Sequence, residues 1–277
     1  MTFCYFGHHK CATTWFASVI PAVCQDIGLS WESSDSPADF DFAADKAKAD
    51  FLMFRNAGRN HLPPDRPYRG FHMIRDLRDI AVSAVHSHRS SHPTEMWADL
   101  KDMREKLKTM TFEESLLWEL DYLKPVFDQI GSWNYSNPLV KELRMEDLIS
   151  RPYQTALDAF QFLGLVGDET VSTTGRLIFT AKTLLNKPGR PVGHQGKRGP
   201  IRMEQMPAER FLGIVHAFNF KRLAGGREQG KEDTRSHFRK GVAGDWQKAF
   251  TPPVKARFKE LYGESLVRLG YEPDLNW

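Results

Sequence analysis

The chain has 277 residues and a formal net charge of +3, with 41% apolar and 26% charged residues. These proportions exclude a disordered chain, a collagen-like repeat and a coiled coil. The net charge is too small to imply nucleic-acid binding by itself, and no run of 18 apolar residues predicts a membrane-spanning helix. All three cysteines lie in the first 24 residues, which is no disulfide framework. Together with the lack of a signal-peptide pattern, this predicts a cytoplasmic protein.

Short apolar runs alternate with segments of helical periodicity along the chain. The apolar runs predict strands at residues 2–6, 51–54, 70–74 and 139–143. Apolar residues at helical spacing predict helices at residues 13–23, 79–88, 111–130 and 255–269, and a further helix that begins at Pro152. Residues 30–50 are expected to form a surface loop followed by a short helix, and the Gly- and Pro-rich residues 187–200 to form a long loop. Strands that alternate with helices indicate an α/β fold, and no linker or repeat divides residues 1–277, so a single domain is expected.

The first chemically informative segment runs from Gly7 to Trp15 and reads GHHKCATTW. It lies between a predicted strand and a predicted helix, where free backbone N–H groups and the helix dipole favour a phosphate. Lys10 adds a full positive charge, Thr13 and Thr14 add hydroxyls, and Trp15 offers a flat face to a base. An ordinary N-terminal cap with a surface lysine is the alternative reading of this segment alone.

Two further segments are cationic. Arg75 to Ser83 reads RDLRDIAVS, and it places an arginine after a predicted strand and a serine two turns into the next helix. The carboxyl ends of parallel strands are where open α/β sheets bind ligands, although an Arg–Asp surface network is the alternative. Near the C-terminus, RKGVAGDW begins at Arg239 and continues with Lys240 and Gly241. Glycine lets this backbone approach an oxyanion closely, whereas the alternative is a solvated loop.

Taken together and in this order, the three segments resemble the sulfotransferases that use 3′-phosphoadenosine-5′-phosphosulfate (PAPS), especially the soluble cytosolic type. The resemblance extends over residues 7–246. It implies a P-loop-like three-layer fold with a central parallel sheet flanked by helices, with PAPS as sulfuryl donor and 3′-phosphoadenosine-5′-phosphate (PAP) as product. The match implies that a set of residues binds the nucleotide: Lys10, Cys11, Ala12, Thr13, Thr14, Trp15, Arg75, Ser83, Phe220, Arg239, Lys240 and Gly241.

Within that set, the resemblance implies a role for each part. Residues 10–14 would hold the 5′-phosphosulfate and Trp15 would stack on the adenine, with Phe220 as a looser match to a second flanking aromatic residue. Arg75 and Ser83 would hold the 3′-phosphate, and residues 239–241 would close over the same phosphate. Lys10 would stabilise the leaving phosphate, and Ser83 would hold Lys10 back until the acceptor arrives.

A general base must also take the acceptor's proton, and in the resembled family this base is a histidine in a Thr-His-Leu-Pro segment. His61 in NHLP resembles it and is the candidate, so the predicted catalytic residues are Lys10, His61 and Ser83. Counting from the end of the preceding strand instead places Asn56 at the family's base position, and asparagine cannot accept a proton. His8, His9 and His72 remain alternatives.

The sequence therefore predicts a sulfotransferase without a metal ion that acts on a small-molecule or carbohydrate hydroxyl, or on an amine. It predicts neither nucleic-acid nor membrane partners and leaves the oligomeric state open. Two alternatives remain: a P-loop phosphotransferase that needs Mg²⁺ and ATP, and a nucleotide-binding module without catalysis. The order of Lys10 before the threonine pair and the Arg-Lys-Gly loop count against the phosphotransferase.

Overall fold

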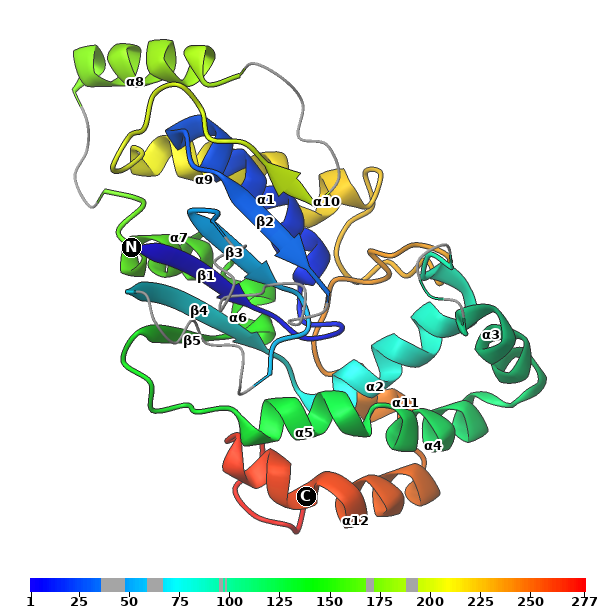
Figure 1. Cartoon of the computed structure of the whole chain (residues 1–277). Helices are drawn as coiled ribbons and strands as arrows, with labels where there is room; N and C mark the ends of the chain where they lie inside the picture. The colour runs from blue at the N-terminus through cyan, green and yellow to red at the C-terminus, as the bar shows by residue number, and fades with distance from the viewer. Residues whose placement is uncertain (36–47, 59–66, 95–96, 98, 168–171, 188–193) are drawn as a thin grey trace. The chain divides into compact units, whose positions relative to one another are not determined.

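The computed structural model describes residues 1–277 except 36–47, 59–66, 95–96, 98, 168–171 and 188–193 (Figure 1). The chain divides into two compact units. Unit 1 comprises Met1–Ile74 and Asn134–Asn219, and unit 2 comprises Arg75–Trp133 and Phe220–Trp277. The single domain expected from the sequence stays a prediction. Among the described residues, every helix is too short or too polar to cross a lipid bilayer.

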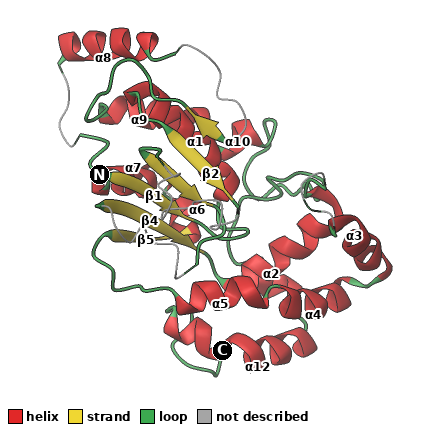
Figure 2. Cartoon of the chain, viewed as in Figure 1, coloured by secondary structure: helices red, strands yellow, loops and turns green. Residues whose placement is uncertain are grey.

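Unit 1 is built on a central sheet. Its strands in the described residues are β1 (Thr2–Phe6), β2 (Trp31–Ser34), β3 (Phe51–Phe54), β4 (Tyr68–Ile74), β5 (Val140–Arg144) and β6 (Gln195–Gly196). They lie in the order β5-β4-β1-β3-β2-β6, and all pairs are parallel except β2 with β6. The predicted α/β fold with a central, mostly parallel sheet flanked by helices is confirmed (Figure 2).

Strand β2 corrects the expectation that residues 30–50 begin with a loop. Its sequence WESS carries little β-propensity, so the local pattern does not reveal a strand. It forms because it pairs in parallel with β3, with Trp31 opposite Phe51, and the Trp31 ring is buried. The short helix expected after this loop falls largely on residues outside the described ones. Strand β6 likewise lies inside the predicted loop 187–200.

Helices of unit 1 pack against this sheet and against one another. They are α1 (Thr13–Ile27), α6 (Met145–Ser150), α7 (Pro152–Phe162), α8 (Thr173–Leu185) and α9 (Ala208–Ala217). Strand register puts Tyr5 opposite Phe71, so both rings project from the same face of β1 and β4. Phe16 of α1 lies 4.7 Å from the Tyr5 ring, and Phe160 of α7 lies 5.7 Å from the Phe71 ring, between ring centroids. Phe211 of α9 continues the contact at 4.7 Å from Phe160. This row of aromatic rings is the core that fixes α1, and hence the loop before it.

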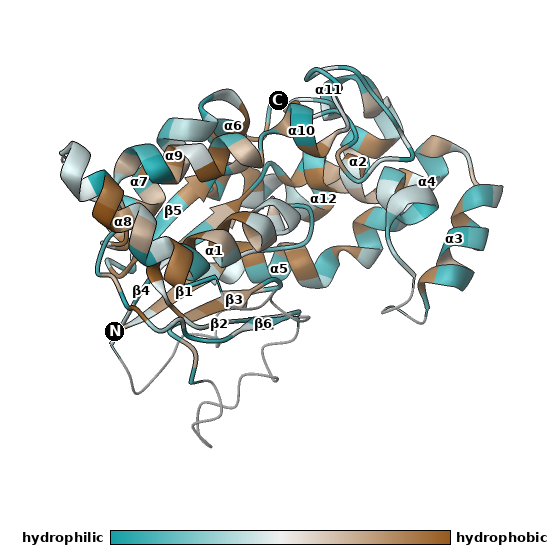
Figure 3. Ribbon diagram, turned by 90° about the horizontal axis from the view of Figure 1, so that it is seen from above, coloured by the Kyte–Doolittle hydropathy of each residue, from teal (hydrophilic) through white to brown (hydrophobic). Residues whose placement is uncertain are grey.

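Helix α8 differs from the other helices of unit 1 because much of its apolar surface faces solvent. Leu177, Ile178, Leu184 and Leu185 are each more than half exposed. Figure 3, coloured by hydropathy, shows hydrophobic residues along the α8 ribbon. Phe179 and Thr183 are its buried residues. Helix α8 therefore contributes little of its apolar surface to the core.

Unit 2 is helical in its described residues. Its elements are α2 (Leu77–His86), the π-helical turn η2 (Ser87–Ser91), α3 (Leu100–Thr109), α4 (Phe112–Tyr122), α5 (Lys124–Ser132), α10 (Phe220–Leu223), α11 (Trp246–Ala249) and α12 (Pro252–Arg268). The single helix predicted over residues 111–130 is wrong, because α4 ends at Tyr122. Pro125 has no N–H to continue the hydrogen bonds of α4 and instead occupies the first turn of α5.

The C-terminal end of α1 depends on Gly28. Its φ of +73° lies in the left-handed region, and it caps the helix. The side chain of Asn186 fastens the neighbouring backbone, because it donates to the carbonyls of Asp26 (3.2 Å) and Ile201 (2.7 Å) and accepts from Ile201 N–H. A Cβ atom on Gly28 would lie 2.1 Å from the Ile201 carbonyl oxygen, which this network holds in place.

Replacing Gly28 with alanine is expected to lower the free energy of unfolding by about 2–4 kcal/mol, because left-handed backbone strain adds to a backbone clash. Gly164→Ala is the matched control: its φ is +77°, but no described atom lies within 4 Å of the added Cβ. The control should cost only the backbone strain, about 1 kcal/mol. Urea unfolding of both variants measures the difference, and equal losses would contradict the clash.

Candidate nucleotide-binding site

The loop between β1 and α1 has an unusual backbone. Lys10 and Ala12 have φ angles of +63° and +57°, the left-handed region that non-glycine residues rarely occupy. The loop is fixed at its start, because Gly7 N–H donates to Phe54 (2.8 Å) and the Gly7 carbonyl accepts from Ala57 N–H (2.7 Å). Strand β3 and the residues after it therefore hold the first residue of the loop in place.

Helix α1 begins at the end of this loop. Ala12 is the N-cap residue, and its methyl side chain makes no capping hydrogen bond. The first N–H groups of a helix have no partner within the helix, and their dipole favours an anion. The side chains of Lys10, Thr13 and Thr14 are partly exposed, whereas Cys11 is buried. The predicted arrangement of a lysine, two hydroxyls and a helix N-terminus is present, and it is chemically suited to a phosphate or sulfate group.

Trp15 is held in a defined orientation. Its indole N–H donates to the carbonyl of Phe218, at the end of α9, over 2.8 Å. Its ring meets that of Phe16 edge to face, with centroids 4.8 Å apart. A tryptophan ring oriented by its own N–H is a rigid surface for stacking, which suits the role predicted for it.

The candidates for the general base have different surroundings. His61 lies outside the described residues. Asn56 follows β3 by two residues and donates its side-chain amide to the Asp35 carbonyl over 3.2 Å. His9 is partly exposed, whereas the rings of His8 and His72 are buried and contact each other. A buried ring cannot approach an acceptor directly, so His8 and His72 do not fit the role of base in this conformation.

In unit 2, the RDLRD segment forms a buried network around the start of α2. Asp76 caps the helix and accepts from Arg78, whose guanidinium lies 3.6 Å from the centre of the Trp246 ring. Asp79 accepts from the backbone N–H groups of Gly244 (2.7 Å) and Trp246 (3.0 Å). The network predicted as an alternative exists, but it is buried, and it binds α2 to the C-terminal loop. The sequence analysis assigned no separate role to Arg78 or Asp79.

The cations of the C-terminal loop are paired with carboxylates. Arg239 binds Glu232 and Asp245, and Lys240 binds the other carboxylate oxygen of Asp245. Burial alone would raise the pKa of Asp245, but hydrogen bonds from Lys240 and Arg239 outweigh it and hold that pKa below its ordinary value. Arg239 and Lys240, two of the predicted phosphate ligands, are therefore already paired with carboxylates of the protein.

Phe220 lies against the same loop, and its predicted place beside the adenine stays a prediction. Gly241 has φ +67°, and a Cβ on it would lie 2.6 Å from the Phe220 ring. Arg227 was not among the predicted site residues. Its guanidinium holds the loop by donating to the carbonyls of Phe238 (2.7 Å), Arg239 and Lys231 (2.9 Å each). Glycine is required at position 241 both for its backbone and for the ring packed on it.

Arg75 and Ser83 lie on either side of the first turns of α2. Arg75 directly follows β4 and is 5% exposed, and Ser83 is partly exposed. His86, one turn beyond Ser83, lies near this loop because its imidazole is 4.0 Å from Glu232. Burial and the positive charge of Arg239 lower the pKa of His86 to about 4, against 6.5 ordinarily. The α2 face that carries Ser83 thus lies near the Arg239 cluster within unit 2.

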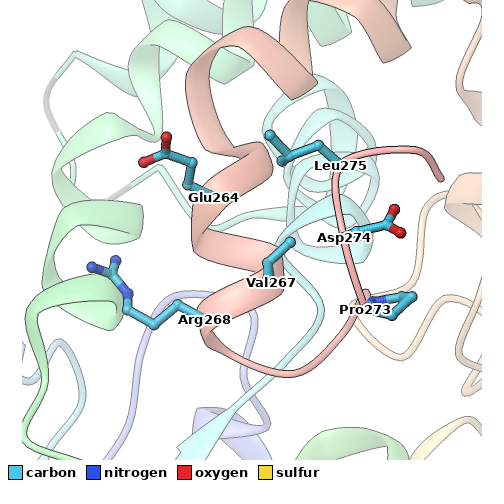
Figure 4. A pocket seen from close by; sticks show the side chains of 6 residues that line it. All are labelled: Glu264, Val267, Arg268, Pro273, Asp274 and Leu275. Carbon is cyan, nitrogen blue, oxygen red and sulfur yellow. The ribbon is translucent and has the colours of Figure 1, made fainter.

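A separate surface pocket of about 540 Å³ lies at the C-terminal end of α12. Figure 4 shows its lining: Glu264, Val267, Arg268, Pro273, Asp274 and Leu275. None of the residues predicted to bind the nucleotide lines it.

The stability of unit 1 should depend on pH through His72. Burial lowers the pKa of His72 to about 3, from 6.5 in an exposed residue. The unfolded chain therefore takes up a proton below pH 6.5 that the folded chain refuses, so stability falls as the pH drops from 6.5 towards 3. Between pH 7 and pH 5, wild type should lose about 2 kcal/mol more unfolding free energy than His72→Gln.

Denaturant unfolding at several pH values measures this difference. Titration of the His72 ring by NMR provides a check that needs no variant, and a ring that takes up a proton between pH 5 and 8 would contradict the expectation.

Comparison with solved structures gives the fold. The chain is similar to mouse sulfotransferase SULT7A1 complexed with PAP, with a TM-score of 0.52 and 19% identity over 96% of this chain and 84% of that one. It is also similar to retinol dehydratase in complex with androsterone and the inactive cofactor PAP (TM-score 0.51, 14% identity, 96% and 80% covered) and with retinol and PAP (0.53, 14%, 96% and 81%). No family model matches the chain, and no curated protein matches it in sequence. The chain has the sulfotransferase fold.

Proposed function

We propose that this protein is a sulfotransferase that moves a sulfuryl group from PAPS to a hydroxyl or amine of an acceptor. The observation that carries the proposal is the β1–α1 loop, where Lys10 and two threonines lie at the N-terminus of α1, whose N-cap residue is Ala12. The same fold is found in solved structures that contain PAP, which is what remains of PAPS after the sulfuryl group has left.

Unit 1 is proposed to bind the 5′-phosphosulfate. Backbone N–H groups of residues 10–14 and the first turn of α1 would surround its oxygens, and Lys10 would neutralise its charge. Trp15, oriented by the Phe218 carbonyl, is proposed to stack on the adenine.

Unit 2 is proposed to bind the 3′-phosphate. Arg75, Ser83, Arg239, Lys240 and the Gly241 backbone are the proposed ligands. Support comes from the loop's fixed shape, since Asp79 and Arg227 hold its backbone through hydrogen bonds. Phe220, packed on Gly241, is proposed to flank the adenine. A guanidinium suits this task because its planar fork matches phosphate oxygens and it never loses its charge.

The proposed reaction is an in-line transfer. The bond between sulfur and the phosphate oxygen of PAPS breaks as a bond from sulfur to the acceptor oxygen or nitrogen forms. Negative charge grows on the leaving phosphate, and Lys10 is proposed to stabilise it. Ser83 is proposed to restrain Lys10 before the acceptor binds. The acceptor's proton passes to a general base, proposed to be His61, which is worth roughly 10²–10⁴ in rate.

The acceptor is proposed to be a small molecule or a carbohydrate. One retinol dehydratase structure contains androsterone and another contains retinol, both small molecules with hydroxyl groups. Screening hydroxylated and amine acceptors with labelled PAPS would identify the compound.

Calorimetry with PAP and transfer from labelled PAPS test the function. PAP should bind equally well with Mg²⁺ and with EDTA, and more tightly than ATP, because the proposed ligands are cations and N–H groups of the chain. Tighter, Mg²⁺-dependent binding of ATP would contradict the proposal and favour a phosphotransferase. PAP binding without sulfuryl transfer to any acceptor would indicate a nucleotide-binding module without catalysis.

Replacing Lys10 with alanine should lower kcat by about 10²–10³, because the charge on the leaving phosphate loses its main stabilising partner. PAP should still bind, since backbone N–H groups contribute to its site. Lys182→Ala, on the exposed side of α8, is the matched control and should retain wild-type turnover. A Lys10→Ala protein with wild-type kcat would show that Lys10 takes no part in the chemical step.

Replacing Arg239 with alanine should weaken PAP about tenfold to a hundredfold, because charge-assisted bonds to the 3′-phosphate are lost. Adenosine 5′-monophosphate lacks that phosphate, so its affinity should change little. Arg235→Ala, at an exposed arginine in the same loop, is the control. Calorimetry measures all six affinities, and an equal loss for both nucleotides would refute the assignment of Arg239 to the 3′-phosphate.

A further inference from the structure

Three hydrogen-bonded side chains, the His8–His72–Glu142 row, lie in unit 1 beside the β1–α1 loop. His8 follows β1, His72 lies on β4 and Glu142 lies on β5. The Nε2 atoms of His8 and His72 are 2.7 Å apart, and Nδ1 of His72 is 2.6 Å from Oε2 of Glu142. Strand register explains the second contact, because His72 and Glu142 are directly opposite each other in the parallel pair and so project from the same face.

The order of the groups in this row determines which ring nitrogens of His8 and His72 carry a proton. The Glu142 carboxylate only accepts hydrogen bonds, so Nδ1 of His72 must donate to it. Burial keeps His72 neutral, and its pKa is about 3, so its Nε2 carries no proton and accepts. Nε2 of His8 must then be the donor of the 2.7 Å bond. Glu142 thereby determines the tautomer of His72, and His72 determines which nitrogen of His8 holds a proton.

The His8–His72–Glu142 row is joined at His8 to the backbone of the loop that carries Lys10. The His8 carbonyl accepts from Cys11 N–H over 3.0 Å, so the position of His8 determines the turn between these residues. That turn contains Lys10, whose left-handed φ of +63° costs backbone strain. Strained backbone persists only where its surroundings hold it, and both histidine rings are fully buried. The structure therefore anchors the loop through a side chain that precedes Lys10 by two residues.

We propose that Glu142 and His72 act through His8 as positioning residues, which hold the β1–α1 loop in the conformation that binds the phosphosulfate of PAPS. This inference rests on the proposed function. His8 has no exposed ring surface, so its role is to hold the loop rather than to contact the acceptor. Glu142, at 28% side-chain exposure, is the one member of the three that contacts solvent.

The first test reads the proton positions in the full-length protein without any ligand. In ¹⁵N-histidine-labelled wild type, His72 should carry its proton on Nδ1 and His8 should carry a proton on Nε2. Glu142→Gln keeps a carbonyl oxygen as acceptor, so both assignments should persist. Glu142→Leu removes the acceptor, and the tautomers should change, together with the amide shifts of residues 9–14. A wild-type His72 protonated on Nε2 would overturn the proposal even if no variant folds.

The second test uses steady-state kinetics and PAP binding. Glu142→Leu should raise the KM for PAPS and the Kd for PAP about tenfold to a hundredfold, the range typical of lost supporting hydrogen bonds. Glu142→Gln should stay within about threefold, since it preserves the hydrogen-bond order. Glu32→Leu is the control, because Glu32 is another partly buried glutamate on the same sheet, on β2.

The outcomes separate this inference from the proposed function. A wild type that neither binds PAP nor transfers sulfuryl groups refutes the proposed function, while tautomers and amide shifts still report on the loop. A wild type that transfers sulfuryl groups, with Glu142→Leu unchanged in KM, Kd and loop amide shifts, refutes the positioning role alone. Equal effects of Glu142→Leu and Glu32→Leu also refute it, because a general loss of stability would then explain both.

Discussion

The shape of the β1–α1 loop depends on the hydrogen bonds that join Gly7 to Phe54, at the end of β3, and to Ala57, which follows this strand. Gly7 donates to Phe54 and accepts from Ala57, so the loop begins at a fixed point beside the carboxyl ends of two central strands, β1 and β3. The left-handed residues Lys10 and Ala12 then turn the chain into α1 within a few residues. The aromatic core beneath, from Tyr5 through Phe16, fixes the direction of the helix. Without these constraints, donors and positive charge would not gather at one place.

Unit 2 achieves the same rigidity in another way. The Asp79 carboxylate and the Arg227 guanidinium bind the backbone of its C-terminal loop, in addition to backbone hydrogen bonds within the loop such as that from Gly230 N–H to the Lys240 carbonyl. Asp79 binds two N–H groups of the loop, and Arg227 binds three of its carbonyl groups. Asp79 is far from the loop in sequence, so a local pattern shows the cations of the loop but not this carboxylate, which binds its backbone. Arg227 lies only 4 to 12 residues from the carbonyl groups that it binds.

The sequence allowed the strands β1, β3, β4 and β5 and the helices α1, α2, α7 and α12 to be predicted, because their apolar spacing is local, whereas α3, α6, α8, α9, α10 and α11 were not predicted. It did not allow β2 to be predicted, since WESS becomes a strand only through its pairing with β3. The helix over residues 111–130 was wrongly continued through Pro125, a residue whose missing N–H should have marked the break. The motifs indicated Lys10, Arg239 and Gly241 as nucleotide ligands, which stays a prediction, and the contact of Phe220 with Gly241 was not foreseen. The burial of His8 and His72 could not be predicted, because it arises from side chains on three strands or their ends.

The pairing of Arg239 and Lys240 with Asp245 has a consequence for any phosphate that reaches them. Such an anion would have to displace the Asp245 carboxylate, which is already paired with both cations. The free energy of binding is therefore the difference between the new ion pair and the one that it replaces. Departure of that anion is eased for the same reason, since Asp245 is tethered six residues away from Arg239 and returns at high effective concentration. An internal competitor of this kind lowers the affinity for the anion and speeds its release.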